Sequence, residues 1–276
     1  MSVGIKHKIK ELIIQSLLRV VAGKLLKKKY PAAIILDERN YDVYGVGEGG
    51  WQSGVTTENC LQDLYEGKFD QAVKKATDGL GKSFQGKDVS FVCEQSRYKH
   101  YITCKMAGIA ARLDGDFISI GVSWGVLPFA VLEYTDTRKD YYLVDKWDGY
   151  IDDKGAQSEG AVKTHPSYCN DFDAVRERFK KFGNVKFIYG FAPECLESLK
   201  SEKIAFLQTD AGNAEAEAKS IELLWPRIIS GGIVVVDNYS SAGGGNRGLF
   251  LDVLSKLPGQ HEMLATLHGQ LIVFKI

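Results

Sequence analysis

The stretch GDFISIGVSWG, residues 115–125, decides the fold class of this chain. Its apolar segment 117–121 is typical of a buried strand, and Gly121 and Gly125 then let the backbone turn tightly and approach a ligand without a Cβ in the way. A helical pattern over 126–134 follows the turn, so strand, turn and helix form one unit of a β/α series. Taken alone, this glycine spacing is also common in turns that serve only packing.

Outward from this stretch, short β-branched segments alternate with helical ones down to the C-terminus. We therefore expect an α/β fold with a Rossmann-like, doubly wound, mostly parallel sheet and helices on both faces. The remaining strands are predicted at 141–145, 185–189, 204–209, 232–237 and 271–275, and helices at 98–113, 171–182, 215–228 and 247–256.

The N-terminal part of the chain reads differently, and we expect residues 1–90 to form a helical extension or cap on a catalytic domain at 91–276. Residues 6–29 predict an amphipathic helix with basic ends, and 61–80 a second helix, with a short strand at 89–93. Two interpretations of the first helix stay open. It contacts an anionic membrane surface peripherally, or it packs on the domain or across a homo-oligomer.

Composition narrows the class of protein. The chain has 276 residues with 35 basic and 35 acidic side chains, which gives no electrostatic case for a nucleic-acid partner. Its five cysteines show no CxxC spacing, which favours reduced thiols and a cytoplasmic location. No apolar run reaches the roughly 18 residues of a membrane span. We expect a small-molecule or glycan substrate.

A carboxylate follows the glycine turn at the distance that Rossmann-like sheets use. Asp145 ends the strand at 141–145, roughly twenty residues beyond Gly121, where an acidic side chain accepts hydrogen bonds from ribose hydroxyls. The alternative interpretation makes Asp145 a cap for the segment that follows it.

Two later strands also end in oxygen-bearing side chains. Asp210 follows FLQT, and Asp237 and Asn238 follow IVVV. Since the carboxyl ends of parallel strands meet at one edge, the three side chains can converge, and two carboxylates with an amide oxygen suit Mg²⁺ or another divalent cation better than zinc. The alternative is that both aspartates only cap strand ends.

Three segments together resemble the class I S-adenosylmethionine-dependent methyltransferases, and more narrowly the macrocin O-methyltransferase family. They are the glycine stretch at 115–125, YLVDKWDGY at 142–150, and WPRIISGGIVVVDNY at 225–239, of which the last is the most specific. The resemblance covers about residues 94–275. The set Asp210, Asp237 and Asn238 is also similar to the metal site of catechol O-methyltransferase.

The resemblance implies a cofactor site for S-adenosylmethionine. This chain departs from the pattern in three places. Ser119 stands where relatives carry an acid for the amino group of the donor, Gly212 stands where macrocin-type enzymes carry a further acid, and Asp237-Asn238 replaces their usual aspartate pair. The implied cofactor-binding residues are Arg97, Ser119, Gly121, Val122, Ser123, Gly125, Asp145, Lys146, Trp147, Gly190 and Phe191.

The expected activity is metal-dependent transfer of a methyl group from S-adenosylmethionine to a hydroxyl of a sugar or small polyol, on a natural-product or surface-glycan acceptor. The general base stays open. Asp210 and His268 are the predicted catalytic residues, with His165 and His100 as weaker candidates. Two rivals remain, an NAD(P)-dependent oxidoreductase, for which no GxGxxG follows the first core strand, and a non-catalytic scaffold that keeps the cofactor fold.

Overall fold

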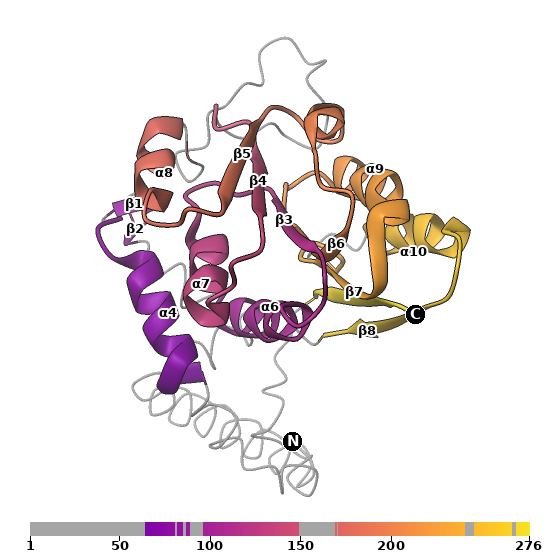
Figure 1. Cartoon of the computed structure of the whole chain (residues 1–276), viewed down its shortest axis with the longest axis horizontal. Coiled ribbons are helices and arrows are strands. Elements are labelled where there is room, and N and C mark those ends of the chain that lie inside the picture. The colour runs from indigo at the N-terminus through magenta and orange to yellow at the C-terminus, as the bar shows by residue number, and fades with distance from the viewer. Residues whose placement is uncertain are drawn as a thin grey trace, which may run out of the picture.

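The structure is a computed structural model, and its described part forms a seven-stranded sheet with helices on both faces (Figure 1). The predicted Rossmann-like α/β architecture is confirmed. The predicted helix at 6–29 and the strand at 89–93 lie outside the described residues. The described residues are 64–80, 82–84, 87–88, 96–148, 169, 171–240, 246–266 and 269–276, with backbone alone for 82–84 and 87–88.

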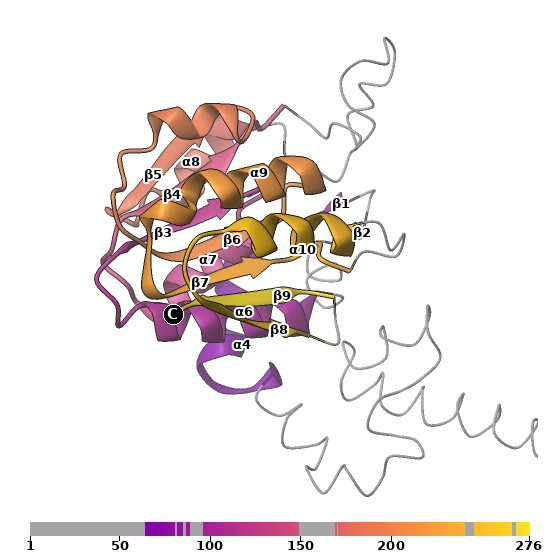
Figure 2. The same ribbon diagram turned by 90° about the vertical axis from the view of Figure 1, so that its right-hand side faces the viewer.

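The strand order in the sheet is β5-β4-β3-β6-β7-β9-β8, which Figure 2 shows from top to bottom. The chain adds β4 and β5 on one side of β3 and then returns to place β6 on the other side, so the winding reverses between β3 and β6. Pairing is parallel from β5 to β7 and antiparallel where β9 joins β7 and β8. The strands are β3 (Asp116–Ile120), β4 (Tyr141–Asp145), β5 (Val185–Tyr189), β6 (Ile204–Thr209), β7 (Ile228–Val236), β8 (His261–Ala265) and β9 (Leu271–Lys275).

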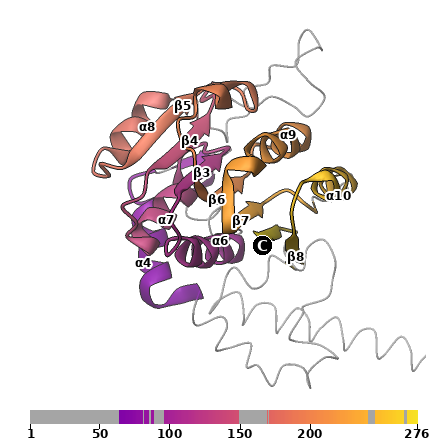
Figure 3. The same ribbon diagram turned by 45° about the vertical axis from the view of Figure 1, so that its right-hand side comes forward.

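Helices divide between the two faces of the sheet (Figure 3). One face carries α4 (Gly67–Thr77), α6 (Arg97–Ala110), α7 (Val126–Thr135) and α8 (Phe172–Phe179). The other carries α9 (Ala214–Leu224), α10 (Asn246–Lys256) and the short 3₁₀ helix η3 (Glu194–Ser198), while a second 3₁₀ turn, η4 (Trp225–Arg227), leads into β7. A separate two-stranded pairing joins β1 (Lys82–Phe84) and β2 (Lys87–Asp88).

Coverage of both faces explains why the central strands are mostly apolar. Every residue of β6 is buried, and successive side chains enter opposite layers, Phe206 with Phe117 toward α6 and α7, and Leu207 with Ile118 toward α9. Because the two layers are filled in this way, polar side chains reach solvent only at the strand ends, where the site lies.

Several details differ from the sequence prediction, including the unpredicted strands β1 and β2. Strand β8 was not predicted, because it is an edge strand whose residues are mostly exposed and which therefore lacks an alternating apolar pattern. Strand β7 begins at Ile228 and not at Gly232, since the chain enters the sheet directly from η4.

The boundary predicted at residue 90 stays a prediction. Helix α4, on the N-terminal side of it, packs directly against α7 and buries Phe69 and Val73 in the same core layer. None of the described helices is long and apolar enough to cross a membrane. Among the described cysteines, Cys104, Cys169 and Cys195 carry free thiols.

Candidate functional site

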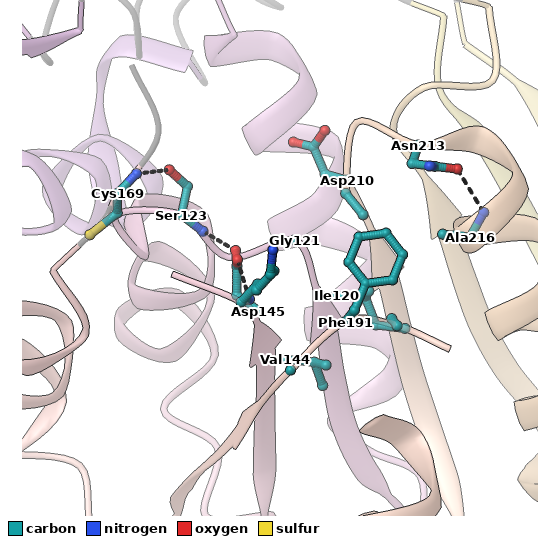
Figure 4. A pocket seen from close by; sticks show the side chains of 14 residues that line it. Ile120, Gly121, Ser123, Val144, Asp145, Cys169, Phe191, Asp210, Asn213 and Ala216 are labelled. Atoms are coloured by element: carbon teal, nitrogen blue, oxygen red, sulfur yellow. Dashed lines mark hydrogen bonds between the residues drawn. The ribbon is translucent and has the colours of Figure 1, made fainter. Parts of the chain in front are cut away.

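A pocket opens at the carboxyl ends of β3, β4 and β6, where the winding of the sheet reverses (Figure 4). Open α/β sheets bind ligands at this point because loops leaving neighbouring strands diverge. The empty space is about 700 Å³, a volume that includes open solvent at the pocket mouth. It is lined by Ile120, Gly121, Ser123, Val144, Asp145, Lys146, Cys169, Gly190, Phe191, Ala192, Asp210, Ala211, Asn213 and Ala216.

The glycine turn forms one wall of the pocket by touching the end of β6. The amide of Asp210 donates to the Ile120 carbonyl at 2.8 Å, and Gly121 has φ +84°. A Cβ at Gly121 would lie 2.1 Å from the main-chain oxygen of Asp210. Only glycine permits both this conformation and this approach, which brings the predicted donor turn against the predicted catalytic aspartate.

Asp145 is held by four backbone amides. One carboxylate oxygen accepts from Val122 and Ser123, both at 2.7 Å, and the other from Lys146 at 2.6 Å and Trp147 at 3.1 Å. A carboxylate has about four acceptor positions, so these bonds fill them. Asp145 therefore fixes the glycine turn and caps its own following segment. The predicted hydrogen bond between Asp145 and a ribose hydroxyl therefore requires that one or more of these amides give up its bond to the carboxylate.

The structure brings together six of the predicted cofactor-binding residues and places five elsewhere. Gly121, Ser123, Asp145, Lys146, Gly190 and Phe191 line the pocket, whereas Arg97, Ser119, Val122, Gly125 and Trp147 do not.

Four of the five other residues, Ser119, Val122, Gly125 and Trp147, lie next to the pocket-lining residues and support them. Ser119 bonds the buried Tyr141 hydroxyl at 2.7 Å, and Trp147 Nε1 donates to the Ser123 carbonyl at 3.0 Å. Gly125 lies against the ring of Phe179. Their predicted contact with the cofactor stays untested.

Arg97 lies in a buried ion pair between α6 and α4. Its guanidinium contacts the Asp70 carboxylate, donates through Nε to the Leu64 carbonyl at 2.7 Å, and stacks on the Tyr65 ring at 4.4 Å. This position makes Arg97 a packing residue between the two helices.

Some pocket residues were missed by sequence reasoning because they are small or apolar. Ala211, Ala216 and Ala192 carry no chemical signal, although Asn213, the N-cap of α9, has a recognisable capping position and accepts from the Ala216 amide at 2.9 Å. Burial raises the pKa of the Cys169 thiol to about 11, so this pocket thiol stays protonated and is no nucleophile at neutral pH.

The three predicted metal ligands do not share one coordination position. Asp237 is engaged by Lys99 Nζ and Gln270 Nε2, both at 2.9 Å, on the α6 side of the sheet. Asn238 points its amide nitrogen at Asp210 Oδ1, 2.9 Å away, on the α9 side. Among the described residues, no group of three or more His, Cys, Asp or Glu side chains could hold a metal ion. As arranged, the donors do not fit a hard divalent cation.

Glu217 on α9 belongs to this acidic end of the sheet, although the sequence pattern did not single it out. It is fully buried, and it accepts from Thr209 Oγ1 and the Ala211 amide at 2.9 Å and from Asn238 Nδ2 at 3.1 Å. Burial raises its pKa to about 7, although the bonds from Asn238 and Thr209 oppose the shift.

Asp210 is a second carboxylate that lines the pocket, and it is exposed to solvent at the pocket mouth. Desolvation of its carboxyl group by nearby protein atoms, and then the charges of Asp237 and Glu217, raise the pKa of Asp210 above its ordinary value. His268, the other predicted catalytic residue, lies outside the described residues, as does His165.

Comparisons with known proteins agree with this arrangement. Residues 52–269 match the model of the family described as macrocin O-methyltransferase (TylF). A Streptomyces olivaceus protein, 8-demethyl-8-(2,3-dimethoxy-α-L-rhamnosyl)-tetracenomycin-C 4'-O-methyltransferase, is 24% identical over 151 residues, which cover 50% of this chain and 58% of the relative. The chain thus spans little more than half the length of this curated relative.

Solved structures share the fold. The O-methyltransferase NovP superimposes with a TM-score of 0.59 at 17% identity, covering 75% of this chain and 97% of the other. The S-adenosylhomocysteine-bound methyltransferase PaMTH1 of Podospora anserina gives 0.54 at 16% identity, covering 84% and 98%. Because the family model spans most of the chain, from ahead of α4 to the turn before β9, this protein belongs to the macrocin O-methyltransferase family.

Proposed function

We propose that this protein is an S-adenosylmethionine-dependent O-methyltransferase that methylates a hydroxyl of a sugar or small polyol on a natural-product or surface-glycan acceptor. The observation that carries the proposal is the pocket at the winding reversal, bounded by the glycine turn on one side and by Asp210 on the other. Family membership supports the reaction, and the rhamnosyl-tetracenomycin relative supports a sugar hydroxyl as acceptor.

The residues of the pocket fit the donor. Ile120, Val144 and Phe191 offer apolar walls for an adenine ring, and Gly121 and Gly190 leave the backbone open to close approach. When bound, S-adenosylmethionine supplies an electrophilic methyl group and departs as the neutral thioether. The protein's task is mainly to hold the acceptor oxygen in line with that methyl group, because this transfer depends on near-attack geometry.

The acceptor hydroxyl must lose its proton as the new methyl–oxygen bond forms. Asp210 is our candidate to receive it, because the other carboxylate that lines the pocket, Asp145, already accepts from four backbone amides. His268 stays the second candidate. We propose no metal in this step, since the three predicted ligands are engaged in different directions.

Two wider expectations belong to the proposal without support from the described residues. One is that residues 1–90 form an extension of the catalytic domain. The other is that the helix predicted at 6–29 contacts a membrane surface or a second copy of the chain.

Titration calorimetry with S-adenosylhomocysteine tests the donor site, with NAD⁺ and NADP⁺ as rival ligands. We expect micromolar binding of S-adenosylhomocysteine and none of the dinucleotides. Phe191→Ala, which removes an exposed aromatic wall, should weaken binding about tenfold, since stacking on an aromatic ring contributes about 1–3 kcal/mol per base. The control Leu223→Ala removes a similarly exposed side chain on α9, away from the pocket. Preference for a dinucleotide would refute the methyltransferase proposal, and binding without transfer to any rhamnosylated acceptor would favour a scaffold.

A further inference from the structure

A lysine from α6 reaches the strand end where the metal was expected. Lys99 Nζ lies 2.9 Å from Asp237 Oδ2 and 3.2 Å from the main-chain oxygen of the same residue. The Lys99 side chain is 26% exposed and that of Asp237 12%, so the ion pair lies at the surface end of the core and is partly shielded from solvent. Such shielding makes a charged hydrogen bond stronger than it is in water.

The other oxygen of Asp237 is also occupied. Gln270, fully buried ahead of β9, donates from Nε2 to Asp237 Oδ1 at 2.9 Å, and the same amide nitrogen lies 3.1 Å from Thr103 Oγ1. Thr103 in turn donates to the Lys99 carbonyl at 2.9 Å. The network joins α6, the end of β7 and the start of β9, and it leaves neither carboxylate oxygen of Asp237 without a protein donor.

Asn238 is committed to the opposite face of the sheet. Its amide nitrogen faces carboxylate oxygens of Asp210 and Glu217. With both neighbours ionised, they are acceptors only, and the nitrogen rather than the carbonyl oxygen of Asn238 faces them. A divalent cation shared by Asp210, Asp237 and Asn238 would therefore have to compete with the Lys99 ammonium or the Gln270 amide for an oxygen of Asp237, and Asn238 would have to rotate. Mg²⁺ demands near-octahedral oxygen geometry, and these donors point away from it.

We infer that the Lys99 ammonium takes the place of a divalent cation as the counter-charge of Asp237, so that this chain binds no metal at Asp210, Asp237 and Asn238. Lys99 is then a positioning residue, which fixes Asp237 and offsets part of the negative charge beside the pocket. The part of this inference that concerns the reaction, namely that methyl transfer proceeds without added metal, rests on the proposed function.

Calorimetric titration of the full-length protein with Mn²⁺ alone tests the inference. The variants are Lys99→Met, which removes the ammonium, Lys99→Arg, which keeps the charge, and Lys105→Met as the matched control. Lys105 lies on the same helix, but its ammonium contacts the rings of Tyr101 and Tyr134 and not the acidic strand ends.

We expect no saturable Mn²⁺ binding by wild type, Lys99→Arg or Lys105→Met, and a new single site in Lys99→Met that is lost when Asp237→Asn is added. Lys99→Gln replaces Lys99→Met if circular dichroism shows the latter to be unfolded. Saturable binding by wild type that Asp237→Asn abolishes would overturn the inference, and so would absence of binding in every folded Lys99 variant.

A second measurement separates this inference from the proposed function. Methyl transfer by wild type should be unchanged in excess EDTA, whereas loss of activity restored by Mg²⁺ would contradict the inference. The Mn²⁺ titration uses no methyl donor, so its result does not depend on the proposed function. If the protein fails to bind S-adenosylhomocysteine, the proposed function is refuted, but the inference about the metal is not affected.

Discussion

Replacement of Gly121 by alanine is the sharpest perturbation that the structure offers, because it strikes the contact between the donor turn and the catalytic strand end. The added Cβ would lie 2.1 Å from the Asp210 main-chain oxygen and 2.6 Å from the Cα of Ala211. Both neighbours are backbone atoms, so no side-chain rotation relieves the overlap, and the loop after β6 has to move.

The expected loss has two parts. A non-glycine residue in the left-handed region costs about 1–2 kcal/mol, and forcing extra atoms into a packed position costs typically about 1–3 kcal/mol. Together they lower the unfolding free energy by about 2–5 kcal/mol. At roughly 2–4 °C per kcal/mol for a domain of this size, Tm should fall by about 4–20 °C.

The matched control is Gly79→Ala. Gly79 follows α4 with φ +75°, close to the +84° of Gly121, but an added Cβ there meets nothing within 4 Å. The control variant therefore incurs the conformational part alone, about 1–2 kcal/mol. Differential scanning calorimetry of both variants isolates the steric part as the difference between them.

Binding separates the two glycines further. Gly121→Ala shifts the wall that carries Asp210, so we expect S-adenosylhomocysteine affinity to fall at least tenfold, while Gly79→Ala keeps the affinity of wild type. Equal losses of stability in the two variants would refute the close approach of the turn to β6. Unchanged affinity in a folded Gly121→Ala protein would refute the assignment of this turn to the donor site.

Three further predictions test the support of the site and its buried charges. Asp145→Asn removes the charged acceptor of four backbone amides and leaves two of them with no acceptor at all, so it should lower the unfolding free energy by about 3 kcal/mol and weaken S-adenosylhomocysteine binding. Asp148→Asn, at an exposed ion pair nearby, should do neither; denaturant titration and calorimetry compare the two variants. Arg97→Met breaks a buried ion pair and should lower the unfolding free energy by about 3–5 kcal/mol. Lys74→Met, which removes an exposed partner of the same carboxylate, should lower it by less than about 1 kcal/mol. Folded Arg97→Met should still bind S-adenosylhomocysteine, and loss of binding would support the prediction from sequence that Arg97 contacts the cofactor. Burial lowers the pKa of His100 from 6.5 to about 4. The stability that depends on the neutral ring is therefore complete above pH 6.5 and is lost as the pH falls through 4. Between pH 7 and pH 4, the unfolding free energy of wild type should fall by up to about 3 kcal/mol more than that of His100→Gln.

Sequence reasoning worked best where burial leaves a continuous signal. Strands β6 and β7 were predicted because parallel strands covered on both faces are apolar runs, and their polar ends, Asp210 and Asp237, stood out for the same reason. Edge strand β8 has no such signal. Gly121 was predicted as a turn residue, but its reason, the contact with the Asp210 backbone, exists only in the fold.

Sequence reasoning failed where a site is made by distant segments. Lys99 precedes Asp237 by 138 residues, and within a basic helix it reads as one more solvated lysine. Glu217 reads as a surface acid in an AEAEA helix, and Gln270 as a loop residue. Each is identified only through its partner. The sequence indicated that polar strand ends meet at one edge of the sheet. It did not indicate which side chains from distant segments donate hydrogen bonds to them.

The most family-specific motif of the chain, at residues 225–239, consists mainly of residues that pack in the core. Trp225 is fully buried, with Nε1 bonded to the Pro258 carbonyl at 2.8 Å, and Arg227 donates to the carbonyls of Leu199 and Ser201 at 3.1 and 3.3 Å. A Cβ at Gly232 would meet its neighbours at under 3 Å.

These contacts fix where β7 begins and how closely it packs, so its end arrives at the site whatever side chains stand there. Membership of the family and use of a metal are for this reason separable properties. The first depends on residues 225–232, which build the strand. The second depends on what Asp237 and Asn238 contact at its end, and in this chain those contacts are an ammonium, an amide and two neighbouring carboxylates.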